Sequence, residues 1–168
     1  MSTLVAGIGN IFLGDDGFGV EVAQRLADAP FSGEVKVRDF GIRGLHLAYE
    51  MVDGGYGTTI LVDATQRGGA PGTLYLIEPD WERANAPADA HSMTPDAVLA
   101  AVKMLGGACG RVLIVGCEPA SVAEGMGLSP AVARAVPAAV KFVRELIAKG
   151  AADVPGDSGT DRGTDRRQ

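Results

Sequence analysis

The sequence lacks any apolar run that reaches the ~18 residues needed to cross a membrane. It also lacks a recognisable secretory signal, because no Lys or Arg precedes its first apolar stretch and Asn10 interrupts that stretch. Basic residues form no cluster, and the net charge of −6 disfavours nucleic acid as a partner. We therefore expect a cytoplasmic protein that neither inserts into a membrane nor binds nucleic acid.

Cysteine is scarce, since the chain holds only Cys109 and Cys117. They flank the apolar run RVLIVG, and an extended strand of this length would hold them about 26 Å apart, far beyond the reach of a disulfide. Reduced thiols fit the cytoplasm, and the spacing is not that of a zinc site. For Cys117 we favour a packing thiol over a catalytic nucleophile.

Glycine, by contrast, is abundant: 24 of the 168 residues, about twice its ordinary share. Many glycines stand beside acidic residues, which is typical of tight turns at strand ends, where sites are often built. Apolar residues make up 46% and charged residues 21%, the composition of a globular domain. We expect one domain over residues 1–150 and a disordered tail over residues 151–168, where small and charged residues take over.

Short apolar runs alternate with amphipathic segments along the chain. The runs predict strands at residues 3–8, 34–39, 58–63, 73–77 and 111–115. The amphipathic segments predict helices at residues 17–27, 45–52, 94–105 and 130–149. This alternation favours a mainly parallel sheet with helices on both faces. The link between Asp63 and Thr73 is too short for a crossover helix, so we expect the fourth strand to run antiparallel to its neighbour.

Capping and breaking residues mark the ends of the last two helices. Thr94 and Ser129 are the expected N-caps, and each is followed by a proline at the first helical position. Pro137 lies inside the last helix and predicts either a kink or a separate first turn.

The most informative segment is GIGNIFLGDDGFGVEV, a strand followed by glycines and a helix. Its glycines do not fit the dinucleotide-binding fingerprint, because Gly14 follows Gly9 by five positions instead of three. Asp15 and Asp16 stand at the helix entrance, where their charge would repel a phosphate. We therefore disfavour a nucleotide-binding oxidoreductase. One of these carboxylates is expected to cap the helix and the other to face the crevice above the strand ends.

Asp63 ends the apolar third strand and points to a site at the same edge of the sheet. If the first strand lies between the second and third, Asp16 and Asp63 face each other where the strand order reverses. His91 belongs to a polar loop long enough to reach that crevice. Two carboxylates and an imidazole suit a divalent transition metal such as nickel, zinc, manganese or iron. His46 and Glu50, four positions apart on a helix, are a weaker candidate pair.

With these features in place, the chain resembles the nickel-iron hydrogenase maturation endopeptidases. The resemblance is carried in order by GIGNIFLGDDGFGVEV, DFGIRGLHL, LVDATQRGGAPGTL, the loop of His91 and VGCEP, and spans most of residues 1–148. It implies a three-layer α/β/α sandwich with a five-stranded, mainly parallel mixed sheet. It also implies that Asp16, Asp63 and His91 contact the metal and take part in catalysis.

The resemblance further implies a reaction, which is removal of the C-terminal extension of a hydrogenase large-subunit precursor after nickel insertion. Nickel is then the cargo of the precursor and is contacted only transiently. The stretch around Gly41 and Gly44 would border the substrate cleft, with Arg43 exposed between them. A folded substrate favours a monomer with an open cleft. The alternative is a non-proteolytic nickel-sensing chaperone or binding module that keeps the three ligands without cutting.

Overall fold

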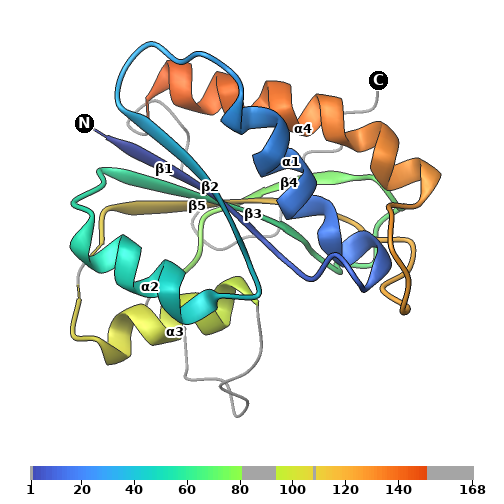
Figure 1. Ribbon diagram of the computed structural model, residues 1–168, viewed down its shortest axis with the longest axis horizontal. Coiled ribbons are helices and arrows are strands. Elements are labelled where there is room, and N and C mark those ends of the chain that lie inside the picture. Colours follow the sequence, from blue (N-terminus) through green and yellow to red (C-terminus); the bar gives the residue numbers. More distant parts are fainter. Residues whose placement is uncertain (1, 81–93, 108, 151–168) are drawn as a thin grey trace.

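The computed structural model (Figure 1) describes residues 2–80, 94–107 and 109–150. Its strands are β1 (Thr3–Ile8), β2 (Val35–Gly41), β3 (Thr58–Ala64), β4 (Leu74–Ile77) and β5 (Arg111–Cys117). Its helices are α1 (Phe18–Ala27), α2 (Gly44–Asp53), α3 (Pro95–Met104) and α4 (Pro130–Lys149), and a 3-10 helix spans Gly14–Gly17. The expected tail over residues 151–168 lies outside the described residues.

The sheet has the strand order β2-β1-β3-β5-β4. The first four strands in that order are parallel, and β4 pairs antiparallel with β5. This confirms a mainly parallel mixed sheet. The short link from β3 carries the chain past the position of β5 to the sheet edge. There β4 pairs with β5 and not with β3.

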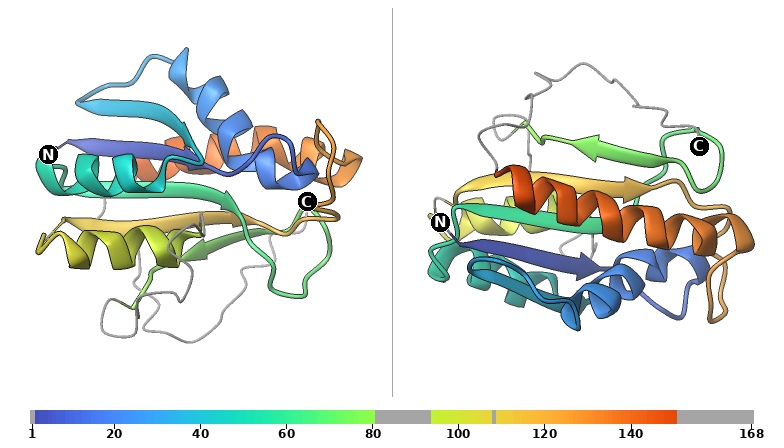
Figure 2. Two further views of the ribbon diagram at one scale, coloured as in Figure 1. Left: turned by 60° about the horizontal axis from the view of Figure 1, so that its bottom comes forward. Right: turned by 90° about the horizontal axis from the view of Figure 1, so that it is seen from above.

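Helices cover both faces of the sheet, which confirms the three-layer sandwich (Figure 1 and Figure 2). Strand residues alternate between two apolar cores. Val5, Val62 and Val115 pack with α1 and α4 on one face. Leu4, Leu61 and Ile114 pack with α2 and α3 on the other. No helix within the described ranges combines the length and apolar character of a membrane span.

The two predicted N-caps behave differently. Thr94 caps α3 as expected, since its hydroxyl accepts the Ala97 N–H at 3.2 Å. Ser129 occupies the N-cap position of α4, but its hydroxyl does not bond to the helix and donates to Asp15 instead. The expected separate first turn at Pro137 is wrong, because α4 is a single 20-residue helix. Pro137 faces solvent, where water can satisfy the carbonyl that it leaves unbonded.

Candidate functional site

A crevice of about 1000 Å³ opens at the carboxyl end of the sheet. The strand order reverses there, because the chain passes from β1 to β2 on one side and to β3 on the other. Asp16 lines the crevice after β1, residues 63–67 line it at and beyond the end of β3, and residues 94–96 line it at the start of α3. In open α/β sheets this is the usual place for a ligand.

Asp16 is held at this crevice by the turn that follows β1. It lies in the 3-10 helix Gly14–Gly17, and its Oδ2 accepts the Asn10 N–H at 2.8 Å. The Asn10 side chain in turn accepts the Phe12 N–H at 2.9 Å. These bonds fix the Asp16 carboxylate, and within residues 2–80, 94–107 and 109–150 they leave its second oxygen, Oδ1, unused.

Asp63 lies at the end of β3 with 4% of its surface exposed. Its Oδ1 accepts the Ala64 N–H at 2.8 Å. Burial, and then the negative charge of Asp16, raise the pKa of Asp63 well above its usual range. The structure therefore brings Asp16 and Asp63 together, as the strand order required. A proton or a cation would relieve their repulsion.

Gly9 makes the approach of these two segments possible. Its φ is 138°, which disfavours a side chain. A Cβ at this position would lie 1.9 Å from the Asp16 carbonyl oxygen and 3.7 Å from Asp63 Oδ1. Gly19 has a similar role, because a Cβ there would lie 2.0 Å from the Val62 carbonyl oxygen. The glycines of the first motif thus allow α1 and its preceding turn to pack directly on the strand ends.

Asp15 turns away from the crevice and is only 1% exposed. Its carboxylate accepts the Ala120, Ser121 and Ser129 N–H groups at 2.8, 3.1 and 2.7 Å, and the Ser129 hydroxyl at 2.8 Å. Burial raises the pKa of Asp15, but these hydrogen bonds outweigh it and hold the pKa below its usual range. The expected cap of α1 by one of the two acids is wrong, since neither the 3-10 helix nor α1 has a side-chain cap. Asp15 instead ties the turn after β1 to the segment before α4.

His91, the third expected ligand, lies outside the described residues. Among the residues that the structure does describe, no three His, Cys, Asp or Glu side chains gather to hold an ion. Of the three expected ligands, the structure describes the two carboxylates, each with one oxygen bonded to a backbone amide. The other oxygens, Asp16 Oδ1 and Asp63 Oδ2, could bind a divalent cation. The remaining ligands of that cation would come from other groups.

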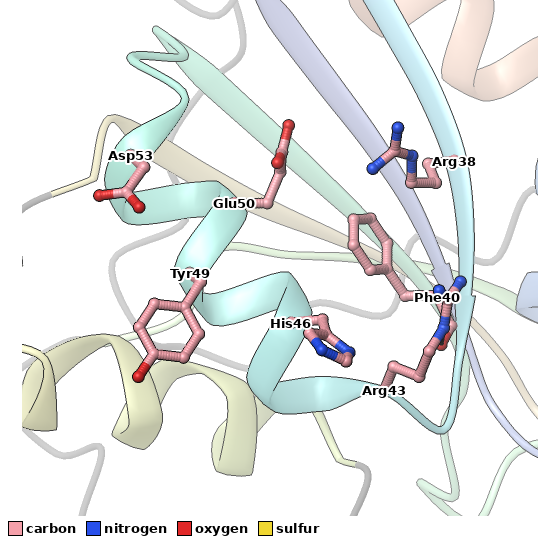
Figure 3. Close-up of a pocket in the computed structure, with 7 residues that line it drawn as sticks. All are labelled: Arg38, Phe40, Arg43, His46, Tyr49, Glu50 and Asp53. Atoms are coloured by element: carbon pink, nitrogen blue, oxygen red, sulfur yellow. Dashed lines mark hydrogen bonds between the residues drawn. The ribbon is translucent and has the colours of Figure 1, made fainter.

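The weaker pair, His46 and Glu50, belongs to a separate pocket on α2 (Figure 3). Glu50 accepts bonds from Lys36 at 2.6 Å and Tyr56 at 2.5 Å, so it serves an ion-pair cluster. Arg43 also lies in this pocket, and its guanidinium donates to the Asp39 and Phe40 carbonyls. Arg43 is exposed between Gly41 and Gly44, as expected, and it does not line the crevice. The bond from the Gly9 N–H to the Gly41 carbonyl at 3.0 Å still ties that turn to the site.

Cys117 is a packing residue, as predicted. Its side chain is fully buried, and burial, then the charges of Asp15 and Glu118, raise the pKa of its thiol to about 12. Burial and this raised pKa disfavour the reactive thiolate at neutral pH and fit a packing role in the core. Cys109 is half-buried, and both cysteines are free.

Glu118 has a role at the crevice that the sequence analysis missed. It is 5% exposed and accepts the Arg67 and Gly68 N–H groups at 2.8 Å each. The Tyr75 hydroxyl donates to it at 3.4 Å. The available signal was an acid placed directly after the apolar run VLIVGC, in the motif VGCEP.

Comparison with known proteins gives the family. A model of the HycI hydrogenase maturation protease family matches residues 20–146, a range that includes Asp63 and begins just after Asp16. The hydrogenase expression/formation protein HupD of Rhodobacter capsulatus is 33% identical over 153 residues, covering 88% of this chain and 72% of HupD.

Solved structures agree with this match. The hydrogenase 2 maturation peptidase from a Thaumarchaeota archaeon has a TM-score of 0.69 at 31% identity, covering 89% of this chain and 100% of that chain. The hydrogenase maturating endopeptidase HybD from Escherichia coli has a TM-score of 0.72 at 27% identity, covering 89% and 92%. The five-stranded sheet, the acid pair at its switch point and these matches lead to one conclusion: the chain belongs to the hydrogenase maturation protease family.

Proposed function

We propose that this chain is an endopeptidase that removes the C-terminal extension of a nickel-iron hydrogenase large-subunit precursor after nickel has been inserted. The observation that carries the proposal is the burial of Asp63 beside Asp16 at the strand ends. Two carboxylates in this position favour a cation over an empty site. The proposed cation is nickel, which the precursor brings with it.

In this proposal Asp16, Asp63 and His91 test whether nickel is present. Asp16 Oδ1 and Asp63 Oδ2 would contact the ion, and the imidazole of His91 would supply a nitrogen ligand. Because the arriving ion would relieve the repulsion between the acids, binding would favour the loaded precursor over the empty one. Recognition would then depend on the metal and not on the precursor fold alone.

Cleavage can use the same groups. The nickel ion near the scissile bond would polarise its carbonyl or activate a water molecule. A carboxylate that is not engaged with the ion would act as the general base. The pKa of Asp63 is raised above its usual range, so its carboxylate is a stronger base than an ordinary one. The reaction needs no thiol nucleophile, which agrees with the buried Cys117.

We propose further that the chain acts in the cytoplasm as a monomer. A folded precursor must reach a crevice that is open at the sheet edge. The free state of both cysteines fits a reducing compartment. Sedimentation of the purified chain at micromolar concentration is expected to give one species of about 17 kDa, the monomer mass.

The decisive experiment incubates the purified chain with nickel-loaded and with nickel-free precursor and measures the mass of the large subunit. We expect a shortened subunit in the loaded sample alone. An intact precursor that forms a nickel-dependent complex would favour the chaperone or binding module instead. Equal cleavage of both samples would refute nickel as the recognition element.

A further inference from the structure

Glu118 anchors one wall of the crevice. The segment between β3 and β4 begins directly after Ala64, one residue beyond Asp63. Two consecutive amides in it, those of Arg67 and Gly68, donate to the Glu118 carboxylate. Each amide takes a different oxygen, Oε2 for Arg67 and Oε1 for Gly68, both at 2.8 Å. The carboxylate thus holds two adjacent backbone positions from one buried point.

The anchor depends on the charge of Glu118. A carboxylate that is 5% exposed has lost most of its hydration, and backbone N–H groups replace that hydration only while the segment stays in place. Glu118 also bonds through its own backbone, since its N–H donates to Thr73 and its carbonyl accepts the Gly72 N–H. Both ends of the link from β3 to β4 are therefore fixed to the end of β5.

The anchored segment is continuous with the acid pair. The β3–β5 register places Asp63 beside Gly116 and Ala64 beside Cys117, so Glu118 follows one step later. The Thr65 N–H continues this pairing to the Cys117 carbonyl at 2.8 Å. A Cβ at Gly116 would lie 2.5 Å from Thr65 Oγ1, so the two segments are in close contact. Thr65 and Arg67 line the crevice next to Asp63.

We infer that Glu118 is a positioning residue for the proposed endopeptidase: by binding the Arg67 and Gly68 amides, its carboxylate holds residues 65–67 as the crevice wall against which the precursor's C-terminal segment binds. The inference rests on the proposed function. Glu118 does not touch the reacting atoms. Loosening the wall weakens binding of the ground state and the transition state alike, so KM changes and kcat does not.

The test compares Glu118→Gln and Glu118→Ala with the wild-type chain in processing of nickel-loaded precursor, well below the melting temperature of each protein. We expect KM to rise on the order of tenfold for Glu118→Gln, which keeps one acceptor oxygen, and further for Glu118→Ala. The kcat is expected to stay within about twofold. Amide exchange at Arg67 and Gly68 should accelerate in the same order.

Glu50→Gln is the matched control. Glu50 is also a partly buried carboxylate with two donors, Lys36 and Tyr56, but it lines the α2 pocket and not the crevice. This variant should lose stability without a change in KM. A purely structural role for Glu118 would give the same result as this control.

Unchanged KM in Glu118→Gln with faster exchange of the two amides would overturn the positioning role, and unchanged exchange would overturn the anchor itself. An inactive wild-type chain would contradict the endopeptidase proposal alone, because the exchange of the two amides still supports or refutes the anchor. The two failures are therefore distinguishable.

Discussion

The Asp15 carboxylate accepts both the N–H and the hydroxyl of Ser129, at 2.7 and 2.8 Å, across 114 positions of sequence. This pair joins the turn that carries Asp16 to the start of α4. Since Asp15 is buried and fully bonded, its removal leaves several donors without an acceptor.

We expect Asp15→Ala to lower the free energy of unfolding by about 2–4 kcal/mol, because the amides of Ala120, Ser121 and Ser129 lose their acceptor. Ser129→Ala removes one of the four bonds and should cost about 1 kcal/mol. Urea unfolding at pH 7 measures both. The folded pKa of Asp15 is lowered, so its contribution is present above the ordinary value of 3.8 and is lost as the pH falls below it. Equal stability of the two variants would contradict this role.

Asp63→Asn should be more stable than the wild type at neutral pH and yet inactive. The folded pKa of Asp63 is raised, so its contribution to stability is present below the ordinary value of 3.8 and is lost as the pH rises through the folded pKa. The amide side chain of the variant cannot ionise, and we expect a gain of about 1–3 kcal/mol at pH 8 that shrinks as the pH falls. Urea unfolding at pH 8 and pH 5 and the processing assay test this.

Asp39→Asn is the control for that experiment, because Asp39 accepts the nearby Gly41 N–H at 2.7 Å and does not line the crevice. It should give no gain at pH 8. Normal processing by Asp63→Asn would exclude Asp63 from the site.

Gly9→Ala should reduce both stability and processing. The methyl group would meet the Asp16 carbonyl, so the turn must move and the acid pair with it. We expect a loss of about 2–4 kcal/mol in unfolding free energy and on the order of 100-fold in kcat/KM. Gly33→Ala is the control that separates backbone strain from steric clash. Gly33 also has a positive φ, 109°, but nothing lies within 4 Å of its Cβ position. That control should cost about 1 kcal/mol and leave processing intact.

His91→Ala should abolish processing with little change in melting temperature, because the proposed role of His91 is to bind the metal. His46 is the other histidine of the chain, and it is exposed on α2. His46→Ala is therefore the natural control and should process normally. If His91→Ala still processed the precursor, or if His46→Ala failed to do so, the assignment of the nitrogen ligand to His91 would be wrong.

Cys117→Ala should keep kcat/KM within about threefold while lowering the unfolding free energy by about 1–2 kcal/mol, the expected effect of a small cavity in the core. Its thiol should also resist alkylation in the folded protein at pH 8, because it is buried with a pKa of about 12. Loss of processing in this variant, with the fold intact, would restore the nucleophile hypothesis.

Local patterns predicted the strands, the mixed sheet and the meeting of Asp16 with Asp63. Each of these follows from periodicity, short links and the topology that they allow. The position of Asp63 could be predicted because it ends an apolar run. The capping role of Thr94 was equally local, since its partner lies three residues away.

Most features that the sequence analysis missed or predicted wrongly depend on contacts between residues that are distant in sequence. Asp15 and Ser129 both have the residue type of a helix cap, and each bonds to the other across the fold. Glu118 binds amides about 50 positions away, so no spacing rule could have indicated its role. Pro137 is tolerated because its side of α4 faces solvent, which a periodicity analysis does not weigh against the proline.

Asp15 and Asp16 are adjacent and chemically identical, yet the 3-10 turn sends one carboxylate into the protein and the other to the crevice. Inserting or deleting a single residue before the two acids would shift both by one position, so a glycine would take the place of one acid. The length of the turn is therefore as strictly constrained as the acids themselves, and relatives should tolerate a different acid here more readily than a different loop length.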